Sequence, residues 1–504
     1  MVFRIGPMTR SLTAALTDTE IPRPFHGGDV MTDSGNTAWL LISAALVMLM
    51  TPGLAFFYGG MSRAKSVLNM MLMSFVSIAV VSVLWVVIGH SLTYSDGPGA
   101  LDMFVGGLDH VGLTNLIGEV EPAAEDGSGG YPLLVDAGFQ MMFAVITVAL
   151  ISGAIADRAK FGAWLLFTPV WALLVYFPVA HWVWGEGWIE ELEIGGYAVI
   201  DFAGGTAVHI NAGAAALALT FVLGRRKGFG SESMRPHNLP FVLLGAALLW
   251  FGWFGFNAGS AYAADGTAAL ALVNTQVATA AAICAWMLVE RFRYGKVSAL
   301  GFASGAVAGL VAITPAAANV TPLGAIAVGA LSGAVCAYAI SWKFKFRYDD
   351  ALDVVGIHMV GGVIGSLVLG LLAAGVTGGS DGLLYGGGVG LLAVQTVAVV
   401  GVMLYSFAAT WVIAKVIDLI MGFRIPEEVE TNGLDHELHA ESAYAFDELD
   451  ELEAEAEAAA VSSPTPPGGE EAEAVSPPTP PGGETASPKA GVQSSASRSR
   501  APGH

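Results

Sequence analysis

Charged residues are scarce in this 504-residue chain. They make up 13% of it, whereas a soluble domain carries about 25%. This shortage excludes an ordinary soluble domain, and a hydrophobic content of 54% with a mean hydropathy of +0.62 indicates an integral membrane protein. Cysteine is also rare. Cys284 and Cys336 both fall inside apolar stretches, so there is no disulfide framework to interpret.

Signal-peptide features and enzyme motifs are missing as well. Residues 1–35 lack an uninterrupted apolar core, because Thr, Asp, Glu and Pro interrupt them after Ala15, and we expect an uncleaved extracellular tail. The apolar segments contain no nucleophile motif, metal-ligand cluster or phosphate-binding loop. We therefore expect no enzyme activity, no cofactor and no metal site.

The excess negative charge is local. Residues 427–504 hold 17 of the acidic residues against Lys489, Arg498 and Arg500, so the rest of the chain carries 26 acids and 19 bases. The net charge of −21 therefore describes the C-terminal end rather than the apolar body.

Apolar stretches of helix length dominate the remainder. A helix needs about 20 apolar residues to cross a bilayer, and eleven segments meet this requirement. We expect them at 37–60, 67–93, 132–156, 161–184, 199–223, 238–262, 267–290, 298–314, 322–342, 353–376 and 390–421. They are rich in Gly, Ala and Ser, which allow helices to approach closely in lipid. The predicted fold is an all-α polytopic membrane protein.

Basic residues occur only in every second connection between these segments. They are Arg63, Lys65, Arg158, Lys160, Arg225, Arg226, Lys227, Arg235, Arg291, Arg293, Lys296, Lys343, Lys345, Arg347 and Arg424. The positive-inside rule makes these connections cytoplasmic and predicts an extracellular N-terminus and a cytoplasmic C-terminus. Arg4, Arg10 and Arg23 run against this orientation. The acidic outer connections could concentrate cations, and simple solvation explains them equally well.

Two segments repeat one arrangement. Asp201–Gly213 and Asp353–Gly362 each begin with an acid, have a glycine three residues later, and place a histidine, His209 or His358, in the apolar part. His209 lies about 12 Å beyond Asp201 at helical rise, near the middle of a bilayer core about 30 Å thick. The fifth and tenth spans are antiparallel, which predicts an inverted five-plus-five repeat with one extra helix. The two histidines would then face each other.

The two acids have a simpler explanation as helix N-caps. We prefer that explanation for Asp353. For Asp201 it stays open, because Trp184, Phe256 and Ser260 are expected at the same outer surface.

Aromatic residues gather at the outer ends of three predicted helices. Phe139 and Phe143 are four residues apart, as are Phe256 and Ser260, so each pair shares a helix face. Together with Trp184 and a carboxylate, these side chains describe a site for a small cation, since cation–π attraction contributes about 0.5–2 kcal/mol per ring. Taken singly, each aromatic is better explained as core or as part of an interface belt.

Below this group the sequence offers no row of charged residues. A metal ion would need several oxygen or nitrogen ligands there. An imidazole away from water is most stable uncharged, and a neutral ring can donate and accept a hydrogen bond. The path suits a small neutral molecule that forms hydrogen bonds, or one that arrives as a cation and travels in neutral form. Ammonium and ammonia have those properties. A purely structural hydrogen bond between the two histidine helices is the alternative.

Long motifs resemble the ammonium transporter/Rhesus superfamily, in its Amt/MEP branch. They are TPGLAFFYGG (51–60), FQMMFAVIT (139–147), AHWVWG (180–185), DFAGGTAVHINA (201–212), KGFG (227–230), PHNLP (236–240), GWFGFNAGS (252–260), FASGAVAGLVAITPA (302–316) and DVVGIH (353–358). The resemblance covers about residues 36–445. It implies a homotrimer of eleven-helix protomers, each with its own pore for ammonium or ammonia and for the analogue methylammonium.

The resemblance also implies roles for single residues. Trp184, Phe143 and Ser260 match the outer ammonium-recruitment site, supported by Asp201. Phe143 and Phe256 match the stacked phenyl gate. His209 and His358 match the twin-histidine pair that carries ammonia and a separately moving proton. Phe57, Tyr58 and Val354 match positions that line or adjoin the pore. The presence of Trp184 and Ser260 favours the Amt branch over the Rhesus branch.

Residues 421–444 resemble the cytoplasmic tail that helps dock PII-type regulatory proteins, with Gly433, Leu434 and Asp435 as the matching core. The acidic stretch 446–457 could extend a helix. PTPPGGE then occurs at 464–470 and at 478–484, in a composition that cannot fold. A solvated tether is the simpler interpretation of this end, and a role in tuning PII docking stays open.

These observations predict an extracellular tail (1–35), a transporter domain (36–423), a regulatory tail (424–457) and a disordered Pro/Gly-rich tail (458–504). The expected function is ammonium transport across the cell membrane, with lipid and a PII-type protein as partners and no nucleic acid. The alternative is an ammonium sensor that signals through its tail or through a PII partner.

Overall fold

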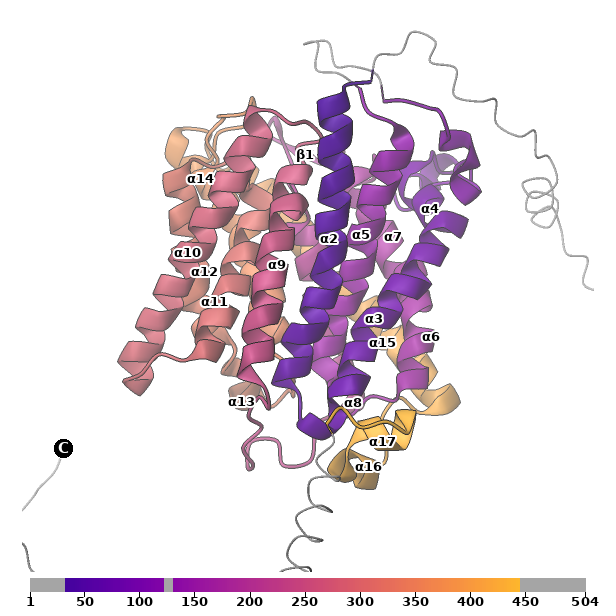
Figure 1. The fold of residues 1–504 in the computed structure, drawn as a ribbon. Helices are drawn as coiled ribbons and strands as arrows, with labels where there is room; N and C mark the ends of the chain where they lie inside the picture. Colours follow the sequence, from indigo (N-terminus) through magenta and orange to yellow (C-terminus); the bar gives the residue numbers. More distant parts are fainter. Residues whose placement is uncertain (1–31, 122–129, 445–504) are drawn as a thin grey trace, which may run out of the picture. The chain divides into compact units, whose positions relative to one another are not determined.

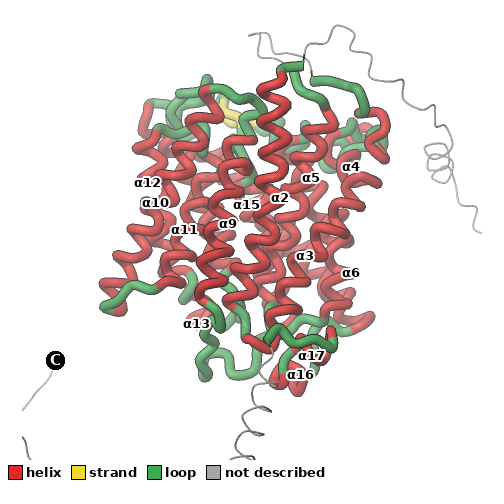
Figure 2. Tube along the Cα trace, viewed as in Figure 1, coloured by secondary structure: helices red, strands yellow, loops and turns green. Residues whose placement is uncertain are grey.

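The structure is a computed structural model that describes residues 32–121 and 130–444. Long helices run side by side through it (Figures 1 and 2), and within the described ranges eleven of them are long and apolar enough to cross a membrane. The prediction of eleven spans is therefore confirmed. Most of the predicted N-terminal tail and everything after residue 444 lie outside the described residues.

Several spans contain a break in the regular helix. The spans are α2 (Ser34–Met61); α3 (Val67–Leu84), η2 (Trp85–Gly89) and α4 (His90–Tyr94); α5 (Leu133–Ile151) and η5 (Ser152–Ile155); α6 (Phe161–Trp171), η6 (Ala172–Tyr176) and α7 (Phe177–Trp184); η7 (Gly205–Ile210) and α8 (Asn211–Leu223); α9 (Leu239–Gly259); α10 (Gly266–Tyr294); α11 (Ala299–Ile313) and η8 (Thr314–Ala316); α12 (Pro322–Ala339) and α13 (Trp342–Phe346); η9 (Val355–Met359) and α14 (Val360–Leu372); and α15 (Gly390–Met421). Four of the breaks, η2, η6, η7 and η9, are π-helices.

The fifth span begins later than predicted. We expected a helix from residue 199, but helical structure starts at Gly205. The backbone of Gly204 has a φ of +110°, which is outside the right-handed helical region. The preceding residues therefore form an irregular connection, and a short hairpin of β1 (Glu193–Ile194) and β2 (Tyr197–Ala198) lies before it.

The helices that carry the two histidines lie inside the bundle. α8 packs against α15 and α5, and α14 packs against α15, α11 and α12. α2 lies along α9, while α10, α11 and α12 form a neighbouring group (Figure 1). The residues of η7 are all buried. The sequence thus delivers its two membrane-depth histidines to the interior rather than to lipid.

Several basic loop residues are neutralised by acids in a buried ion cluster. Arg226 forms two side-chain hydrogen bonds to the Asp349 carboxylate, both 2.9 Å, and Asp157 lies 3.3 Å from both Arg226 and Arg63. The Arg158 side chain is fully buried 3.9 Å from the same Asp349. Burial acts to raise the pKa of Asp349, but the hydrogen bonds and charges of Arg226 and Arg158 outweigh it and hold that pKa below its usual range. These loops are joined to one another at one end of the bundle.

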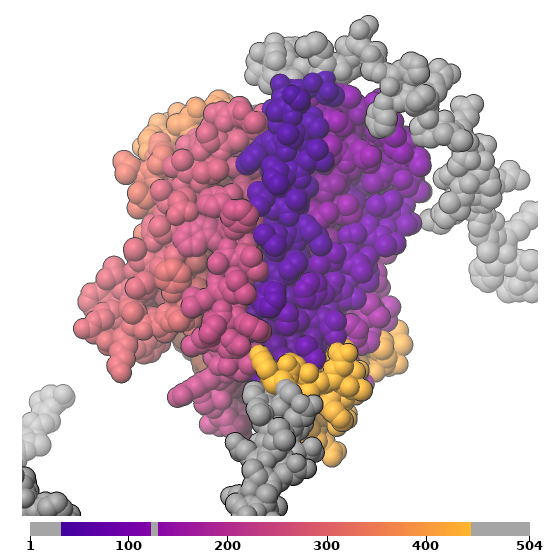
Figure 3. Space-filling view, in the orientation of Figure 1, coloured from indigo at the N-terminus to yellow at the C-terminus, as the bar shows by residue number. Residues whose placement is uncertain are grey.

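The C-terminal helices α16 (Glu427–Asn432) and α17 (Leu434–His439) lie at the same end (Figure 3). α17 packs on η1 (Ala64–Ser66) and on the first turn of α3. The segment that resembles a regulatory tail is therefore docked onto the connection between the first two spans.

Candidate functional site: a histidine pair below stacked phenylalanines

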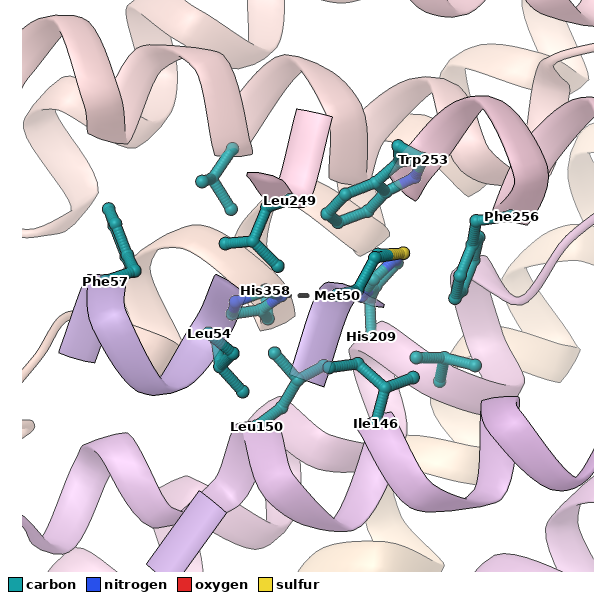
Figure 4. Close-up of a pocket in the computed structure, with 12 residues that line it drawn as sticks. Met50, Leu54, Phe57, Ile146, Leu150, His209, Leu249, Trp253, Phe256 and His358 are labelled. Atoms are coloured by element: carbon teal, nitrogen blue, oxygen red, sulfur yellow. Dashed lines mark hydrogen bonds between the residues drawn. The ribbon is translucent and has the colours of Figure 1, made fainter. Parts of the chain in front are cut away.

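The two histidines meet in the bundle interior. The Nδ1 atoms of His209 and His358 are 3.4 Å apart and their ring centroids 5.4 Å apart (Figure 4). The rings are almost completely buried, with 1% and 3% exposure. If Nδ1 of one ring donates, Nδ1 of the other must accept, so the pair suits two uncharged imidazoles. Nε2 of His209 has no hydrogen-bond partner in the described part of the chain, so it is free to bond a small molecule.

Each histidine belongs to a π-helix, which widens the turn by one residue. His209 lies in η7 and His358 in η9. π-bulges within α-helices are frequent at functional sites. The apolar pattern of the sequence did not distinguish these turns from ordinary α-helix.

Asp201 holds the start of η7. Its carboxylate accepts hydrogen bonds from the backbone N–H groups of residues 204–207 and from the Thr206 hydroxyl, at 2.5–3.1 Å. Burial raises the pKa of Asp201, and these hydrogen bonds act in the opposite direction. Its backbone oxygen accepts from Nε1 of Trp184 at 3.0 Å. Asp201 therefore caps the histidine helix and also fixes an indole of the outer group.

The equivalent cap of the tenth span is Asp350, not Asp353. The Asp350 carboxylate accepts from the N–H groups of Val354 and Val355, at 3.0 and 2.7 Å. Asp353 instead lies 2.6 Å from Nζ of Lys343, so our assignment of it as the N-cap is wrong. Asp350 precedes His358 by eight residues, the same spacing that separates Asp201 from His209. The tenth span therefore matches the fifth more closely when it is aligned on Asp350 than when it is aligned on Asp353, which precedes His358 by only five residues.

Close backbone contact brings the two histidine helices together. A Cβ atom added to Gly213 of α8 would lie 2.5 Å from the backbone nitrogen of Met359, the residue after His358. One added to Gly362 would lie 3.3 Å from Cβ of His209. Small residues at such crossings allow helices to approach where lipid gives no hydrophobic drive. The histidine spacing thus depends on these glycines.

An apolar cavity surrounds the pair. Its walls come from six helices, and Phe256 and Phe57 lie toward opposite ends of the set in Figure 4, with the histidines between them. The lining residues are Met50, Leu54, Phe57, Ile146, Leu150, Val208, His209, Leu249, Trp253, Phe256, Val307 and His358. Among the residues that the structure describes, no ionisable group other than the histidines lines it. This cavity can admit a small neutral molecule but offers an ion almost no replacement for its water.

Trp253 is a cavity residue whose contact with the histidine pair was not predicted. Its ring stacks on His209 with centroids 5.4 Å apart, and its Nε1 donates to the Thr314 hydroxyl at 2.9 Å. The indole therefore packs against one face of the imidazole and limits its movement. The sequence signal was only that Trp253 precedes Phe256 by three residues, which places the two on adjacent parts of one helix face.

The outer aromatic group lies directly above the cavity. Phe143 stacks on Phe256 with centroids 4.2 Å apart, and Phe256 lies 5.9 Å from His209. Trp184 contacts Phe143 edge-on at 6.1 Å. The Ser260 hydroxyl donates to the Phe256 carbonyl at 2.9 Å. The structure thus brings Trp184, Phe143 and Phe256 into a series of ring contacts that ends on His209, and the half-buried Ser260 lies one turn beyond Phe256 on the same helix.

The three remaining predicted pore residues differ in position. Phe57 lines the cavity, whereas Tyr58 and Val354 are absent from its lining. The Tyr58 hydroxyl donates to the Leu150 carbonyl at 3.0 Å, and both Tyr58 and Val354 pack against Gly153. Tyr58 and Val354 therefore adjoin the path without facing the cavity.

The predicted tail residues make close contacts at the opposite end. The Asp435 carboxylate accepts from the N–H groups of Leu68 and Asn69, at 3.0 and 2.8 Å, and so caps α3. Leu434 is fully buried. Gly433 has a φ of +114° and lies so close to Lys65 that a Cβ would meet that residue's backbone oxygen at 2.7 Å.

The sequence did not reveal a second anchor of the tail. Glu430 is fully buried, with its carboxylate 2.7 Å from Arg424 and accepting from the backbone N–H of Lys227 at 2.6 Å. The only sequence signal for this role was the position of Glu430, three residues before Gly433. The tail is therefore anchored on both sides of that glycine.

Comparison with known proteins identifies the family. The model of the "Ammonium Transporter Family" matches residues 38–444. An ammonium transporter of Mycobacterium tuberculosis is 53% identical over 437 residues, covering 82% of this chain and 91% of the relative. One from Bacillus subtilis is 48% identical over 413 residues, covering 81% and 98%. These relatives are named as transport proteins rather than enzymes.

Solved structures agree with these matches. Saccharomyces cerevisiae Mep2 superposes with a TM-score of 0.72 and 33% identity, covering 79% of this chain and 92% of Mep2. A structure titled "Sensor Amt Protein" gives a TM-score of 0.71 and 28% identity, covering 81% and 98%. The chain is a multi-pass membrane protein and belongs to the ammonium transporter family.

Proposed function

We propose that this protein takes ammonium from the outside, removes its proton, and conducts ammonia and the proton separately to the cytoplasm. The observation that carries the proposal is the pair of touching imidazoles in a cavity that otherwise has only apolar and aromatic walls. An ammonium ion would lose most of its hydration there without gaining equivalent ligands. Ammonia would lose less and could hydrogen-bond to the rings.

In this mechanism the outer group selects the cation. Trp184 and Phe143 supply aromatic faces and Ser260 supplies a hydroxyl oxygen, while Asp201 fixes the Trp184 indole through its backbone oxygen. The stacked Phe143 and Phe256 must part to admit the molecule. His209 then meets it first, because His209 contacts Phe256, and His358 follows.

The imidazole pair provides a route for the proton. A neutral imidazole can take a proton at one nitrogen and release one from the other. Because the Nδ1 atoms of His209 and His358 are within 3.4 Å, a proton can pass between the rings without a charged group in the walls. Net movement of one positive charge per ammonia would result.

The wider arrangement belongs to the same proposal. The basic connections favour an extracellular N-terminus and a cytoplasmic C-terminus, so the docked tail at 424–444 would face the cytoplasm. There it would present a surface to a PII-type protein that closes the pore. We further propose that three protomers assemble, each with its own path, in the lipid bilayer.

An ammonium sensor is the second candidate. The solved structure titled "Sensor Amt Protein" shares the fold, and a docked tail could transmit a binding event to a partner. A sensor would keep the outer group and bind ammonium without conducting it.

Electrical recording on reconstituted membranes tests the two candidates. We expect a current with ammonium, a smaller one with methylammonium, and little with potassium, which has no proton to release. Intact binding without any current in the wild-type protein would favour the sensor. Potassium currents as large as ammonium currents would contradict the proposed selectivity.

Two classes of variant separate recruitment from conduction. His209→Ala or His358→Ala should lower the current or change its ion selectivity, because each removes part of the proton route. Trp184→Leu should mainly raise the ammonium concentration that gives half-maximal current, since the indole contributes about 0.5–2 kcal/mol of cation–π attraction. Unchanged flux and selectivity in both histidine variants would remove the assigned role of the pair.

A further inference from the structure

A carboxylate on α5 has no cationic partner among residues 32–121 and 130–444. Asp136 precedes Gln140 by four residues and Phe143 by seven, so all three lie on one face of the helix. Within the described ranges its only side-chain hydrogen bond comes from the Tyr262 hydroxyl, which lies 3.0 Å from Oδ1, and it takes part in no ion pair. Its second oxygen and its negative charge are therefore available to a ligand.

We propose that Asp136 and Tyr262 form an additional capture site for ammonium or another small monovalent cation, outside the Phe143–Trp184–Ser260 group. The inference rests on the proposed function, which it extends by a first binding step. The cation would meet the carboxylate before it reaches the indole.

Aromatic rings connect Asp136 to the outer group without a gap. The Tyr262 ring lies 5.4 Å from Tyr131 and 5.9 Å from Phe139, and Phe139 lies 4.9 Å from Phe143. Phe139 itself is fully buried, whereas the Tyr262 and Tyr131 rings are half-buried. Aromatic faces attract cations through their quadrupole, so these two tyrosines can favour a cation beside the carboxylate, and Phe139 links their position to the stacked pair.

The position of Tyr262 is held at a conformational cost. It follows Ser260 by two residues, in the turn that ends α9, and its φ is +57°, a left-handed conformation that side chains other than glycine rarely adopt. Gln140 donates to its hydroxyl at 2.5 Å, and that hydroxyl donates to Asp136. Burial raises the pKa of Tyr262, so the phenol keeps its proton and can donate it to the carboxylate.

A structural hydrogen bond that pins this turn is the simpler explanation, and one substitution separates the two. Asp136→Asn retains an oxygen that can accept from Tyr262 but removes the charge. We expect the ammonium concentration for half-maximal current to rise about two- to fivefold at low salt. The reason is the loss of one negative charge that lies about 5–10 Å from a cation on its way to the outer group. The maximal current should not change. The shift should shrink as ionic strength rises, because the screening length falls from about 30 Å at 0.01 M salt to about 3 Å at 1 M.

Two further variants serve as controls. Glu193→Gln removes an equal charge from an exposed position in β1 and should leave the half-maximal concentration within about 1.5-fold of the wild type, since exposed charges are largely screened by water and salt. Tyr262→Phe removes the hydroxyl but keeps the ring and the Asp136 charge, and should have a smaller effect than Asp136→Asn. Equal shifts in Asp136→Asn and Glu193→Gln, or a larger effect of Tyr262→Phe, would overturn the proposal.

A binding measurement keeps this test independent of transport. Calorimetric titration of the purified full-length protein with methylammonium should show weaker binding in Asp136→Asn than in the wild type. If the wild type binds more tightly than Asp136→Asn but passes no current, transport fails while the capture site survives. If the wild type conducts and Asp136→Asn binds and conducts like it, the capture site fails while transport survives.

Discussion

Replacing Gly213 by alanine should uncouple the two histidines while leaving the outer group intact. The added Cβ would lie 2.5 Å from the backbone nitrogen of Met359, 2.6 Å from its Cβ and 2.7 Å from its Cα. Backbone cannot rotate out of the way as a side-chain end can. η9 and α8 must therefore move apart.

The size of that movement follows from the contact distances. Ordinary van der Waals contacts begin near 3.4 Å, so the helices must separate by about 1 Å, at a cost of about 1–3 kcal/mol for overpacking. The Nδ1 atoms of His209 and His358 are already 3.4 Å apart, at the limit of a hydrogen bond. A further 1 Å removes the direct contact. Because misplacement by about 1 Å can lower a rate about 100-fold, we expect the ammonium current to fall about 10- to 100-fold.

Current recordings in proteoliposomes and methylammonium calorimetry would measure the two effects separately. Conduction should fall in Gly213→Ala, whereas binding should stay near the wild-type value, since the outer group does not contact Gly213. Gly362→Ala is milder, because its nearest contact would be a side-chain atom, Cγ1 of Ile210 at 2.9 Å, and its nearest backbone contact would be at 3.1 Å, so it should give an intermediate loss. Gly266→Ala is the control, because its Cβ would meet no atom within 4 Å.

The relative losses of current in the three variants test this argument. A correctly folded Gly213→Ala protein with wild-type current would refute the argument that this helix crossing sets the histidine distance. An equal loss in Gly266→Ala would refute it as well, since that substitution creates no clash.

The remaining predictions concern the end of the bundle that holds the ion cluster and the tail. Asp349→Asn leaves the buried Arg158 and Arg226 without their shared acid and should destabilise the protein by about 3–5 kcal/mol, seen as a lower thermal unfolding temperature in detergent. Because the pKa of Asp349 is lowered in the folded state, its stabilising contribution is complete above about pH 5 and is lost as the pH falls through the folded pKa. A wild-type unfolding temperature that falls no more than that of Asp349→Asn between pH 5 and pH 3 would contradict this. Asp435→Ala removes the cap of α3, at a cost of about 0.5–2 kcal/mol, and should expose the tail to limited proteolysis, whereas the exposed Glu437→Ala should not.

The sequence predicts the membrane spans well because each depends on local composition. A run of about 20 apolar residues bounded by charged connections is sufficient to define one. The start of the fifth span was harder to predict from the sequence, because residues 199–204 are apolar enough to extend the helix. In the structure Gly204 adopts a positive φ, and the Asp201 side chain caps the first turn. Capping geometry was the missing information.

The candidate site was predictable in its members but not in its geometry. Helical spacing placed Phe256 and Ser260 on one face, and membrane depth singled out His209 and His358. Hydrogen bonds between distant segments could not be read from spacing. Asp350 and Asp353 are three residues apart, and only the contact of Asp353 with Lys343 shows which of them is free to cap η9.

Contacts between residues far apart in the sequence account for the other features that the sequence did not predict. Trp253 stacks on a histidine 44 positions earlier in the chain, and Glu430 binds the backbone of Lys227. Neither pairing leaves a local pattern. The π-helices likewise depend on how the surrounding helices pack, since the sequence of residues 205–210 is compatible with an α-helix.

The stacked Phe143 and Phe256 would also limit how fast the proposed pathway can work. Their centroids are 4.2 Å apart, so nothing the size of a water molecule fits between them while they are stacked. If the pathway crosses these rings, each passage requires a side-chain rotation, and the stacked rings interrupt any continuous water column. Throughput would then be set by the frequency of ring opening, one molecule at a time, rather than by diffusion through a permanently open bore.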